Sequence, residues 1–330
     1  MSGRVLVTGG LGFIGSAFVR ALAADGQAVL NVDAGTYAGD ERRLAEVGPE
    51  LVETVRMDIV DPGLAEVVRA ERPPLLVHFA AETHVTRSEG AGETFFRTNV
   101  DGTRGVLDAA LAAGVERVVH ISTDEVYGPC PADPFREDQK LPGEGLATSA
   151  YARSKAVADD LARSYADRLA VVIARPTNCI GPWQHPEKAV PRWATRALRG
   201  ERLPVWGDGQ QVRDWMFVDD AVSGLRALAE RGEPGTAYNL GPAGEAVPNV
   251  EIARMVARAA GAGSDAVYLS AYDRPQHDRR YAVSTERAAA LGWAATRTVG
   301  DAVAETVAWY RDHTEWWQTL VPEAERLYAD

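Results

Sequence analysis

Cysteine is scarce in this chain of 330 residues, which has only Cys130 and Cys179. Domains held together by disulfides use many more, so a disulfide framework is excluded and two free thiols are expected. Long hydrophobic runs are missing too, because no segment approaches the roughly 18 apolar residues of a membrane span. The N-terminus starts with the strand-like stretch 4–7 and lacks the basic, apolar and small-residue pattern of a signal peptide. These absences predict a cytoplasmic protein that does not associate with membranes.

Basic charge is in deficit as well, since 35 lysines and arginines face 47 aspartates and glutamates, a formal net charge of -12. Nucleic-acid phosphates need a basic face, so no nucleic-acid partner is predicted. A small anionic substrate remains compatible with this balance, because a few arginines in a pocket can hold it. Zinc patterns are absent, since the spacings of His84, His185 and His277 fit none, and we predict no metal site.

The first half of the chain does contain a regular alternation of β-branched runs with amphipathic stretches. Strands are predicted at 5–8, 28–32, 52–57, 75–79, 117–121 and 170–174, and helices at 14–24, 63–70, 102–113 and 151–165. Repeated strand–helix–strand units form a parallel sheet that helices cover on both faces. We therefore predict an α/β fold, a Rossmann-type doubly wound parallel sheet with a smaller mixed α/β substrate lobe.

After Pro176 the pattern changes, because prolines and glycines interrupt the alternation. Long irregular loops of this kind usually carry function. We assign residues 1–178 to the sheet domain, with a probable return at about 212–230, and residues 179–330 to the substrate lobe. The aromatic tail from Trp309 to Trp317 is predicted to pack within that lobe.

The first predicted strand runs into a glycine-rich turn, Gly9-Gly10-Leu11-Gly12-Phe13-Ile14-Gly15. Such glycines permit a tight turn, close approach of backbone N–H groups to a pyrophosphate, and close packing of the following helix. The pattern alone can be a structural turn, but here it follows a strand and opens a helix. Asp33 at the end of the second strand would pair with a ribose 2′-hydroxyl, which favours NAD over NADP. Asp58 and Ile59 follow the third strand, where an adenine edge would lie.

Tyr151 and Lys155 lie four residues apart on a predicted helix and so project from one face. A phenol acts as a base near neutral pH only if its pKa is lowered, and we expect the adjacent ammonium to lower it. A pair at this spacing also occurs on ordinary surface helices. The glycine-rich turn upstream makes a catalytic pair the stronger interpretation.

Two neighbouring carboxyl groups, Asp124 and Glu125, follow Thr123 in the stretch HISTDEVYG. Repulsion and burial can raise the pKa of one of two adjacent carboxyls, which divides acid and base roles between them. A dehydratase needs this division, because one group removes a carbon-bound proton while another protonates a leaving hydroxyl. A solvated turn is the alternative interpretation of an acidic pair after a strand.

Along nearly its whole length the chain resembles the dTDP-glucose 4,6-dehydratase family of extended short-chain dehydrogenases/reductases. The matching stretches are TGGLGFIGS, NVDAGTYAGD, HFAAETHVTRS, RTNVDGT, HISTDEVYG, SAYARSKA, GPWQHPEKAVP, GQQVRDW and DRPQHDRRYAV. The Thr-Asp-Glu triplet is the specific element, since epimerases of the same superfamily are similar elsewhere but differ there.

This resemblance implies an NAD-dependent hydro-lyase of deoxysugar biosynthesis, which converts a nucleotide-diphosphate hexose to its 4-keto-6-deoxy form. Tyr151, with Thr123 and Lys155, would take the proton of the sugar 4-hydroxyl while the C4 hydride passes to NAD⁺. Glu125 would remove the C5 proton and Asp124 would protonate the departing C6 hydroxyl. The hydride then returns to the sugar, so NAD would stay bound as a prosthetic group.

The resemblance also implies which residues bind the ligands and how copies of the chain associate. The cofactor would contact Gly9, Gly12, Phe13, Ile14, Gly15, Asp33, Thr36, Asp58, Ile59, Ala80, Ala81, Thr98, Tyr151 and Lys155. The substrate would contact Thr83, Asn178, Lys188, Arg213, Asn249, Arg274 and His277. The Ala-rich helices that begin at Gly102 and Tyr151 would pair across a twofold axis in a homodimer.

Two departures from the family pattern limit the substrate assignment. Cys179 stands where the family has a second asparagine, and Thr86 where it has an aspartate. A thiol replaces an amide poorly, which motivates the hypothesis that the substrate is a modified hexose. Two alternative functions remain open, an epimerase or decarboxylase of the same superfamily and a non-enzymatic NAD-binding sensor. Glu125 argues against the former, and the Tyr151–Lys155 pair argues against the latter.

Overall fold

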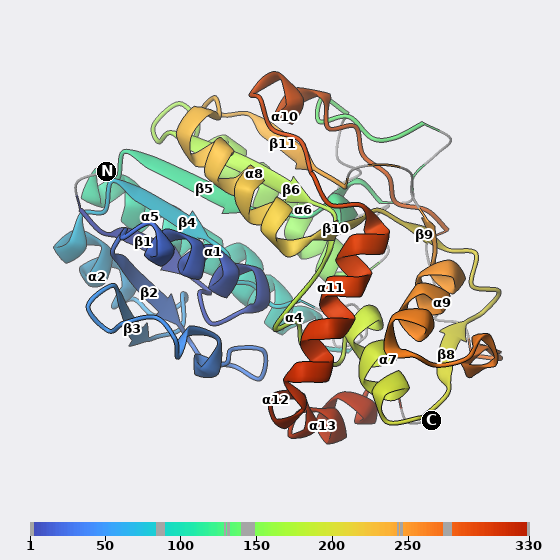
Figure 1. The fold of residues 1–330 in the computed structure, drawn as a ribbon. Helices are drawn as coiled ribbons and strands as arrows, with labels where there is room; N and C mark the ends of the chain where they lie inside the picture. The colour runs from blue at the N-terminus through green and yellow to red at the C-terminus, as the bar shows by residue number, and fades with distance from the viewer. Residues whose placement is uncertain are drawn as a thin grey trace.

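The computed structural model describes residues 3–83, 90–128, 130, 133–139, 149–242, 244, 247–272 and 279–328. Figure 1 shows a large sheet flanked by helices and, beside it, a smaller lobe of helices and short strands. The sheet part contains β1 (Val5–Thr8), α1 (Phe13–Ala24), β2 (Val29–Asp33), η1 (Glu41–Leu44), β3 (Val52–Arg56), α2 (Leu64–Glu71), β4 (Leu75–His78), α4 (Gly92–Phe96), the π-helical η2 (Arg97–Gly102), α5 (Thr103–Ala113), β5 (Arg117–Ile121), η3 (Asp124–Tyr127), α6 (Ala150–Ser164), β6 (Val171–Pro176), α8 (Val218–Arg231), β11 (Ala237–Leu240) and α10 (Glu286–Ala290).

The smaller lobe and its connections take up most of the remaining chain. They contain β7 (Asn178–Ile180), α7 (Ala189–Leu198), β8 (Leu203–Trp206), β9 (Val212–Arg213), β10 (Trp215–Phe217), β12 (Val247–Pro248), α9 (Asn249–Ala260), η5 (Ser264–Ala266), β13 (Val267–Ser270), α11 (Val299–Asp312), α12 (Thr314–Gln318) and α13 (Val321–Arg326). Helices α7, α9 and α11 pack on one another around an apolar core that includes Val250, Tyr310 and Trp317. Trp316 and Trp317 are buried in this core, so the prediction that the aromatic tail packs within the lobe is confirmed.

The large sheet has seven parallel strands in the order β11-β6-β5-β4-β1-β2-β3. The chain starts at β1 in the interior, adds β2 and β3 on one side, and then crosses to β4 on the other. In a doubly wound sheet, ligands bind at the carboxyl ends of the strands where the order reverses. Here that position lies between β1 and β4, directly above the glycine-rich turn.

Both faces of the sheet are buried because alternate side chains of each strand point to opposite sides. On β1, Val5 and Val7 join a core with helices α1 and α8, whereas Leu6 joins a second core with α2 and α5. The predicted Rossmann-type fold is therefore confirmed. The six predicted strands and four predicted helices of the first half differ from the structure by at most two residues at either end.

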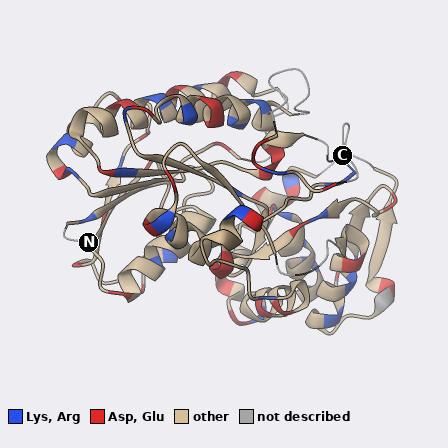
Figure 2. Ribbon diagram, turned by 90° about the horizontal axis from the view of Figure 1, so that it is seen from above, with Lys and Arg blue, Asp and Glu red and all other residues tan. Residues whose placement is uncertain are grey.

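The second half contributes to the sheet part beyond the expected range as well as within it. The sequence analysis placed a return at about 212–230, whereas the sheet part gains helix α8 and also β11, which pairs with β6. Acidic and basic residues alternate along many of the helices in the ribbon of Figure 2. No helix in the described part of the chain has the length and apolar character that a membrane crossing requires.

Candidate active site

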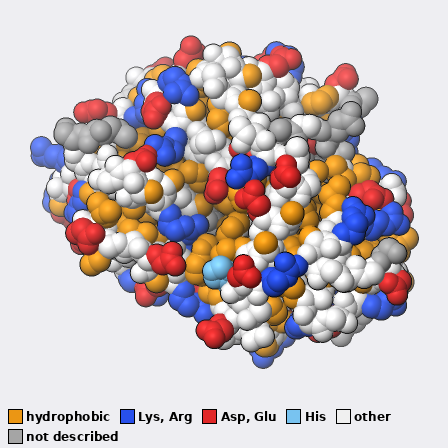
Figure 3. Space-filling view, in the orientation of Figure 1, with side chains coloured by type: hydrophobic (Ala, Val, Ile, Leu, Met, Phe, Trp, Pro, Cys, Tyr) orange, Lys and Arg blue, Asp and Glu red, His pale blue; other side chains and the backbone are white. Residues whose placement is uncertain are grey.

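A cavity of about 500 Å³ lies between the carboxyl ends of the strands and the smaller lobe. On the face shown in Figure 3, hydrophobic side chains gather where the two parts meet. Every site residue predicted from the sequence lines this cavity, apart from Arg274 and His277, which lie outside the described residues. Thr86 also lies outside them. The structure thus brings residues from 9 to 249 into one site.

The glycine-rich turn forms one end of the cavity, and its glycines serve different purposes. Gly9 has a left-handed φ of 78°, and a Cβ there would lie 2.5 Å from the backbone nitrogen of Ala80. A Cβ on Gly15 would lie 2.2 Å from the carbonyl oxygen of Gly9, so α1 packs against the turn only without a side chain there. At Gly12 a Cβ would have only that same oxygen within 4 Å, at 3.2 Å. Phe13 and Ile14 line the cavity, so α1 begins at the position where a pyrophosphate would be held.

Asp33 closes the adjacent edge of the turn. One carboxylate oxygen accepts from the backbone N–H of Leu11 at 2.9 Å, and the other accepts from Gly35 at 2.7 Å. These bonds hold the carboxylate at the end of β2, where a ribose would lie. The residues of this end fit a dinucleotide, with Asp58 and Ile59 lining the cavity further along.

The acidic pair begins the short helix η3 directly after β5. Thr123 caps this helix, because its hydroxyl oxygen accepts a hydrogen bond from the Glu125 N–H at 3.3 Å. The same hydroxyl group donates a hydrogen bond to the Asp124 carboxyl at 3.2 Å. Asp124 is only 2% exposed. Burial, followed by the negative charges of Glu125 and Asp214, raises the pKa of Asp124 to about 8. Asp124 therefore keeps its proton at neutral pH and is an acid.

Tyr151 and Lys155 lie in the first turns of α6, which starts after Ser149. The Ser149 hydroxyl oxygen accepts from the Ala152 N–H at 3.0 Å and caps the helix. Lys155 donates to the backbone oxygen of Ile121 at 2.7 Å. Burial lowers its pKa to about 8, an effect that Asp159 opposes. Helix α6 thus holds both side chains at the cavity.

The expectation that Lys155 lowers the pKa of Tyr151 is wrong for this structure. Burial and the charge of Glu125 raise the pKa of Tyr151, while a hydrogen bond with Thr123 acts in the opposite direction. The ammonium is directed at the Ile121 carbonyl, and desolvation and the nearby negative charges both raise the pKa of Tyr151. A base function of Tyr151 therefore requires additional positive charge in the cavity.

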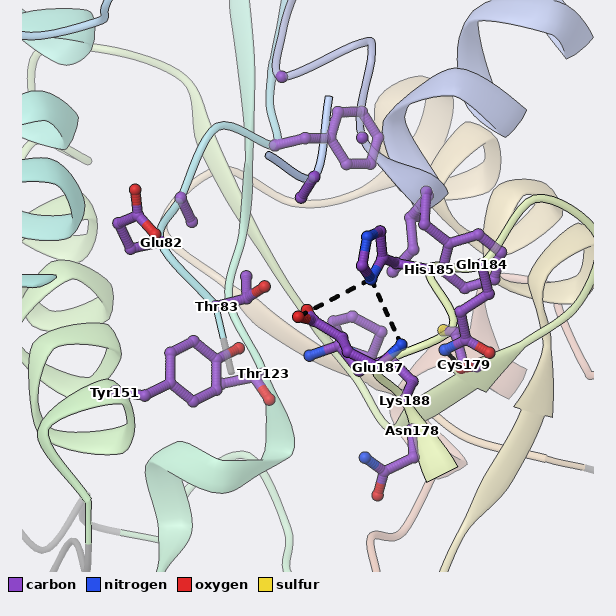
Figure 4. Close-up of a pocket in the computed structure, with 18 of the residues that line it drawn as sticks. Glu82, Thr83, Thr123, Tyr151, Asn178, Cys179, Gln184, His185, Glu187 and Lys188 are labelled. Carbon is purple, nitrogen blue, oxygen red and sulfur yellow. Dashed lines mark hydrogen bonds and ion pairs between the residues drawn. The ribbon is translucent and has the colours of Figure 1, made fainter. Parts of the chain in front are cut away.

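The smaller lobe faces this group from the other side of the cavity. In Figure 4, Asn178 and Lys188 lie across the cavity from Tyr151 and Thr123. Arg213 donates to the Val212 carbonyl at 2.7 Å, and its guanidinium lies 4.5 Å from the centre of the Tyr281 ring. These cationic side chains are placed on β9 and at the start of α7, where the irregular second half meets the sheet.

Several cavity residues were missed by the sequence analysis, among them His185 and Glu187. Glu187 is 1% exposed and accepts from the Tyr37 hydroxyl at 3.0 Å, across the cleft. His185 lies 3.7 Å from the same carboxylate, as the dashed line in Figure 4 shows. Both residues belong to the stretch GPWQHPEK, in which only Lys188 had been assigned. The available signal was the concentration of polar residues in this short stretch, namely Gln184, His185, Glu187 and Lys188.

Buried polar atoms without a hydrogen-bond partner among the described residues cluster in this cavity. They are Ser122 Oγ, Asp124 Oδ2, Thr177 Oγ1, Gln184 Oε1, Trp215 Nε1 and Asn249 Oδ1. Leaving such groups unpaired costs free energy, so their concentration in one cavity marks it as a binding site. No three His, Cys, Asp or Glu side chains within the described ranges are grouped to hold a metal ion.

Cys179 lies in the same cavity and is buried. Its thiol donates to the Thr177 carbonyl at 3.4 Å, and burial together with the charge of Asp124 raises its pKa. It therefore stays a neutral thiol. Neither Cys179 nor Cys130 forms a disulfide.

The known proteins that this chain resembles in sequence and in structure include NAD-dependent epimerases and dehydratases. A model of the "NAD dependent epimerase/dehydratase family" matches residues 5–241. The chain is 43% identical to the dTDP-glucose 4,6-dehydratase of Streptomyces griseus, with 98% of both chains covered. Its structure resembles that of DesIV, a dTDP-glucose 4,6-dehydratase of Streptomyces venezuelae with NAD and dTDP bound, at a TM-score of 0.90 and 40% identity, over 96% of this chain and 99% of that one. It also resembles the structure of the UDP-glucose 4-epimerase of Thermus thermophilus in complex with NAD. The TM-score is 0.85 and the identity 30%, over 94% of this chain and 99% of that one.

Proposed function

The chain belongs to the NAD dependent epimerase/dehydratase family, and from this premise we propose that it is a nucleotide-sugar 4,6-dehydratase whose chemistry is carried by Thr123, Asp124, Glu125, Tyr151 and Lys155. The observation that carries the proposal is the acidic pair on η3. A buried, protonated Asp124 next to Glu125 supplies an acid and a base side by side. An epimerase has no use for that pair.

NAD is the cofactor that this site fits. The turn at Gly9, Gly12 and Gly15 would hold its pyrophosphate, Asp33 a ribose, and Asp58 with Ile59 the adenine end. NAD bound here supplies a hydride acceptor that is regenerated within one turnover, because the hydride returns to the same sugar. The remaining residues assigned to the cofactor, Thr36, Ala80, Ala81 and Thr98, line the same half of the cavity.

The first task of the protein is to remove the proton of the sugar 4-hydroxyl. Tyr151 takes this proton, with Thr123 hydrogen-bonded to its phenol and Lys155 on the same helix. In this structure the pKa of the phenol is raised, so it stays protonated at neutral pH, and removal of the sugar proton depends on positive charge close to Tyr151 to stabilise the phenolate. Lys155 and the oxidised cofactor ring are the two sources of that charge.

The second task is the loss of water. Once C4 is a ketone, the proton on C5 is acidic, and Glu125 removes it as a base. Asp124 holds a proton at neutral pH and gives it to the C6 oxygen, which leaves as water. Glu125 acts as the base of the pair because Asp124 is the more deeply buried of the two carboxyls.

As substrate we propose a dTDP-hexose, with dTDP-glucose as the first to test. Support comes from the dTDP-glucose 4,6-dehydratases to which the chain is similar, and from Lys188 and Arg213, which would bind a diphosphate. Thr83, Asn178 and Asn249 line the cavity around the sugar and nucleotide. Arg274 and His277 remain assigned to the substrate by resemblance. Cys179 brings a thiol where the family has an amide, and it keeps open the hypothesis of a modified hexose.

The test uses the purified chain with dTDP-glucose and UDP-glucose in deuterated water. We expect a 4-keto-6-deoxy product that absorbs in alkali and has lost the mass of one water. Glu125→Gln should abolish both water loss and incorporation of deuterium at C5, whereas Tyr151, the base for the 4-hydroxyl, remains in place. A product epimerised at C4, with no loss of water, would instead support an epimerase.

We also propose a homodimer in the cytoplasm. Leu111 on α5, with Val157 and Leu161 on α6, are only partly buried apolar side chains on adjacent helices. A second copy of the chain would cover them. Leu161→Arg should then halve the mass measured by light scattering, whereas Arg69→Ala on the exposed face of α2 should leave it unchanged. Two unpaired cysteines support a reducing compartment.

A further inference from the structure

Arg43 is a buried cation that, within the described part of the chain, donates its hydrogen bonds to backbone carbonyls. It lies in η1 and is 2% exposed. Its Nη1 donates to the carbonyls of Leu11, at 2.6 Å, and Ala38, and its Nε donates to the carbonyl of Trp183 at 3.0 Å. Within the described residues, no carboxylate forms an ion pair with it. Burying a charge in this way is costly, so an arginine in this position calls for a reason.

The three carbonyls belong to three different segments. Leu11 lies in the glycine-rich turn, Ala38 in the loop after β2, and Trp183 in the stretch 181–188 that leads into α7. The first two segments form the cofactor end of the cavity, and the third brings Glu187 and Lys188 into the substrate end. One guanidinium therefore ties the cofactor half of the site to the substrate half.

Trp183 is held in a backbone conformation that it does not favour. Its φ is +69°, the left-handed region that bulky residues rarely adopt. Its ring packs on Trp309 and Trp316, with ring centres 4.8 and 5.3 Å apart. The surrounding contacts, including the bond from Arg43, keep it there. Strain of this kind persists where the neighbouring structure overdetermines it, and such positions cluster at binding sites.

A second tie runs alongside the first. The Trp316 indole N–H donates to the Asp40 carboxylate at 2.7 Å, and the guanidinium of Arg43 lies 5.7 Å from the centre of that indole. Asp40 also donates its backbone N–H to Leu11, at 3.0 Å. Arg43 directly, and Trp316 through Asp40, thus both act on the Leu11 carbonyl within the glycine-rich turn.

We propose that Arg43 is a positioning residue that holds the glycine-rich turn, the loop after β2 and the 181–188 segment in one arrangement, so that bound NAD is retained between turnovers. The inference rests on the proposed function in that it assumes NAD in this cavity. The planar fork of arginine presents several donors at fixed angles, whereas a lysine presents one point. Removing the Arg43 guanidinium leaves buried backbone carbonyls without hydrogen-bond donors. The 181–188 segment can then move away from the cofactor.

The experiment measures release of NAD from the purified holoenzyme, without any sugar present. Protein carrying isotope-labelled NAD is mixed with excess unlabelled NAD, and the label that remains bound is followed by mass spectrometry. Arg43→Met keeps the apolar stem and should release NAD about 10- to 100-fold faster, the effect of losing hydrogen bonds to a charged group. Arg69→Met is the control, because the side chain of Arg69 lies exposed on α2, pairs with Glu66 and takes no part in these contacts. It should stay within about twofold of the native rate.

A second readout separates positioning from general destabilisation. With NAD saturating, Arg43→Met should raise the KM for the nucleotide sugar more than it lowers kcat, because Glu187 and Lys188 lose their placement. Arg43→Lys should fold and yet release NAD faster than the native chain, and it carries the test if Arg43→Met does not fold. Native-like NAD release in a folded Arg43 variant would overturn the inference. Faster release in a protein that forms no dehydrated product would leave the inference standing and contradict only the proposed function.

Discussion

Burial changes the acid strength of the residues closest to the chemistry. It raises the pKa of Asp124 to about 8 and lowers that of Lys155 to about 8, although the two groups carry opposite charges. In both cases the neutral form is favoured because a charge loses its hydration in the interior. Asp124 is therefore neutral below about pH 8, and it becomes a carboxylate as the pH rises through that value.

Dehydration should accordingly be lost on the alkaline side. We expect kcat to fall as the pH rises through about 8, since Asp124 no longer holds the proton that the leaving hydroxyl needs. Asp124→Asn should lower kcat by about 10²- to 10⁴-fold, the usual contribution of general acid catalysis. The measurement is kcat against pH from 6 to 10 for both proteins. Any alkaline limb that remains in Asp124→Asn would belong to Lys155, and a native rate that keeps rising above pH 8 would contradict the assignment of the acid.

The same group predicts a gain of stability in that variant. The folded pKa of Asp124 lies above the unfolded value, so its neutral form is favoured in the fold, and stability is lost as the pH rises from about 4 to about 8. Asn carries no such penalty. We expect Asp124→Asn to be more stable than the native chain by about 2–4 kcal/mol at pH 8 and by much less at pH 5. Thermal unfolding at the two pH values measures this, and an equal difference at both would rule out the charge as its cause.

At the scale of elements, a buried polar network fixes η3 against its neighbours. Arg175 on β6 makes a two-pronged bond to Asp159 on α6, with both distances 2.8 Å, and donates to the Tyr127 hydroxyl at 2.6 Å. Tyr127 in turn donates to Asn239 on β11 at 2.7 Å. The helix that carries Asp124 and Glu125 is thus attached to the helix that carries Tyr151 and Lys155. The register between the two catalytic groups depends on this attachment.

Tyr127→Phe should loosen that attachment. It removes the acceptor of Arg175 and the donor to Asn239, which leaves two buried polar groups unpaired at a cost of about 1–3 kcal/mol. Urea unfolding measures the loss, and kcat should fall along with it. Tyr165→Phe is the control, because its hydroxyl bonds Asp108 at a part-buried position and should cost less than about 1 kcal/mol. Equal losses in the two variants would argue against a special role for the network.

At the scale of the whole molecule, the site exists only where two parts meet. The sheet domain supplies the glycine-rich turn and the catalytic set, and the smaller lobe supplies Lys188, Arg213 and Asn249. A ligand that spans both parts binds the folded chain and not the unfolded one. By mass action it therefore raises the free energy of unfolding of the whole molecule.

Removal of NAD should therefore lower the melting temperature. Adding it back at one hundred times its Kd should restore about 2.7 kcal/mol. NADP should stabilise the stripped protein much less, because the Asp33 carboxylate repels a 2′-phosphate. Thermal shift titrations with the two dinucleotides make this comparison. Equal stabilisation by NADP would show that Asp33 does not face the ribose.

The sequence by itself determined the alternation of strands and helices, the glycine-rich turn and the motif that carries the acidic pair. These depend on local periodicity and on short stretches, which are present in the order of the residues. The confirmed Rossmann-type fold follows from them. The β11 strand was not foreseen, because its four residues carry no sign of which distant strand they pair with.

Only the tertiary structure decided how individual side chains behave. Arg42 and Arg43 are neighbours of the same type, yet one pairs with Asp40 near the surface and the other is buried on three carbonyls. Tyr37 and Glu187 are 150 residues apart and meet across the cleft. Lys155 is directed at the Ile121 carbonyl, and the pKa of Tyr151 is raised rather than lowered. Burial and charge at a point in space depend on everything packed around it, and packing brings together residues that the chain keeps far apart.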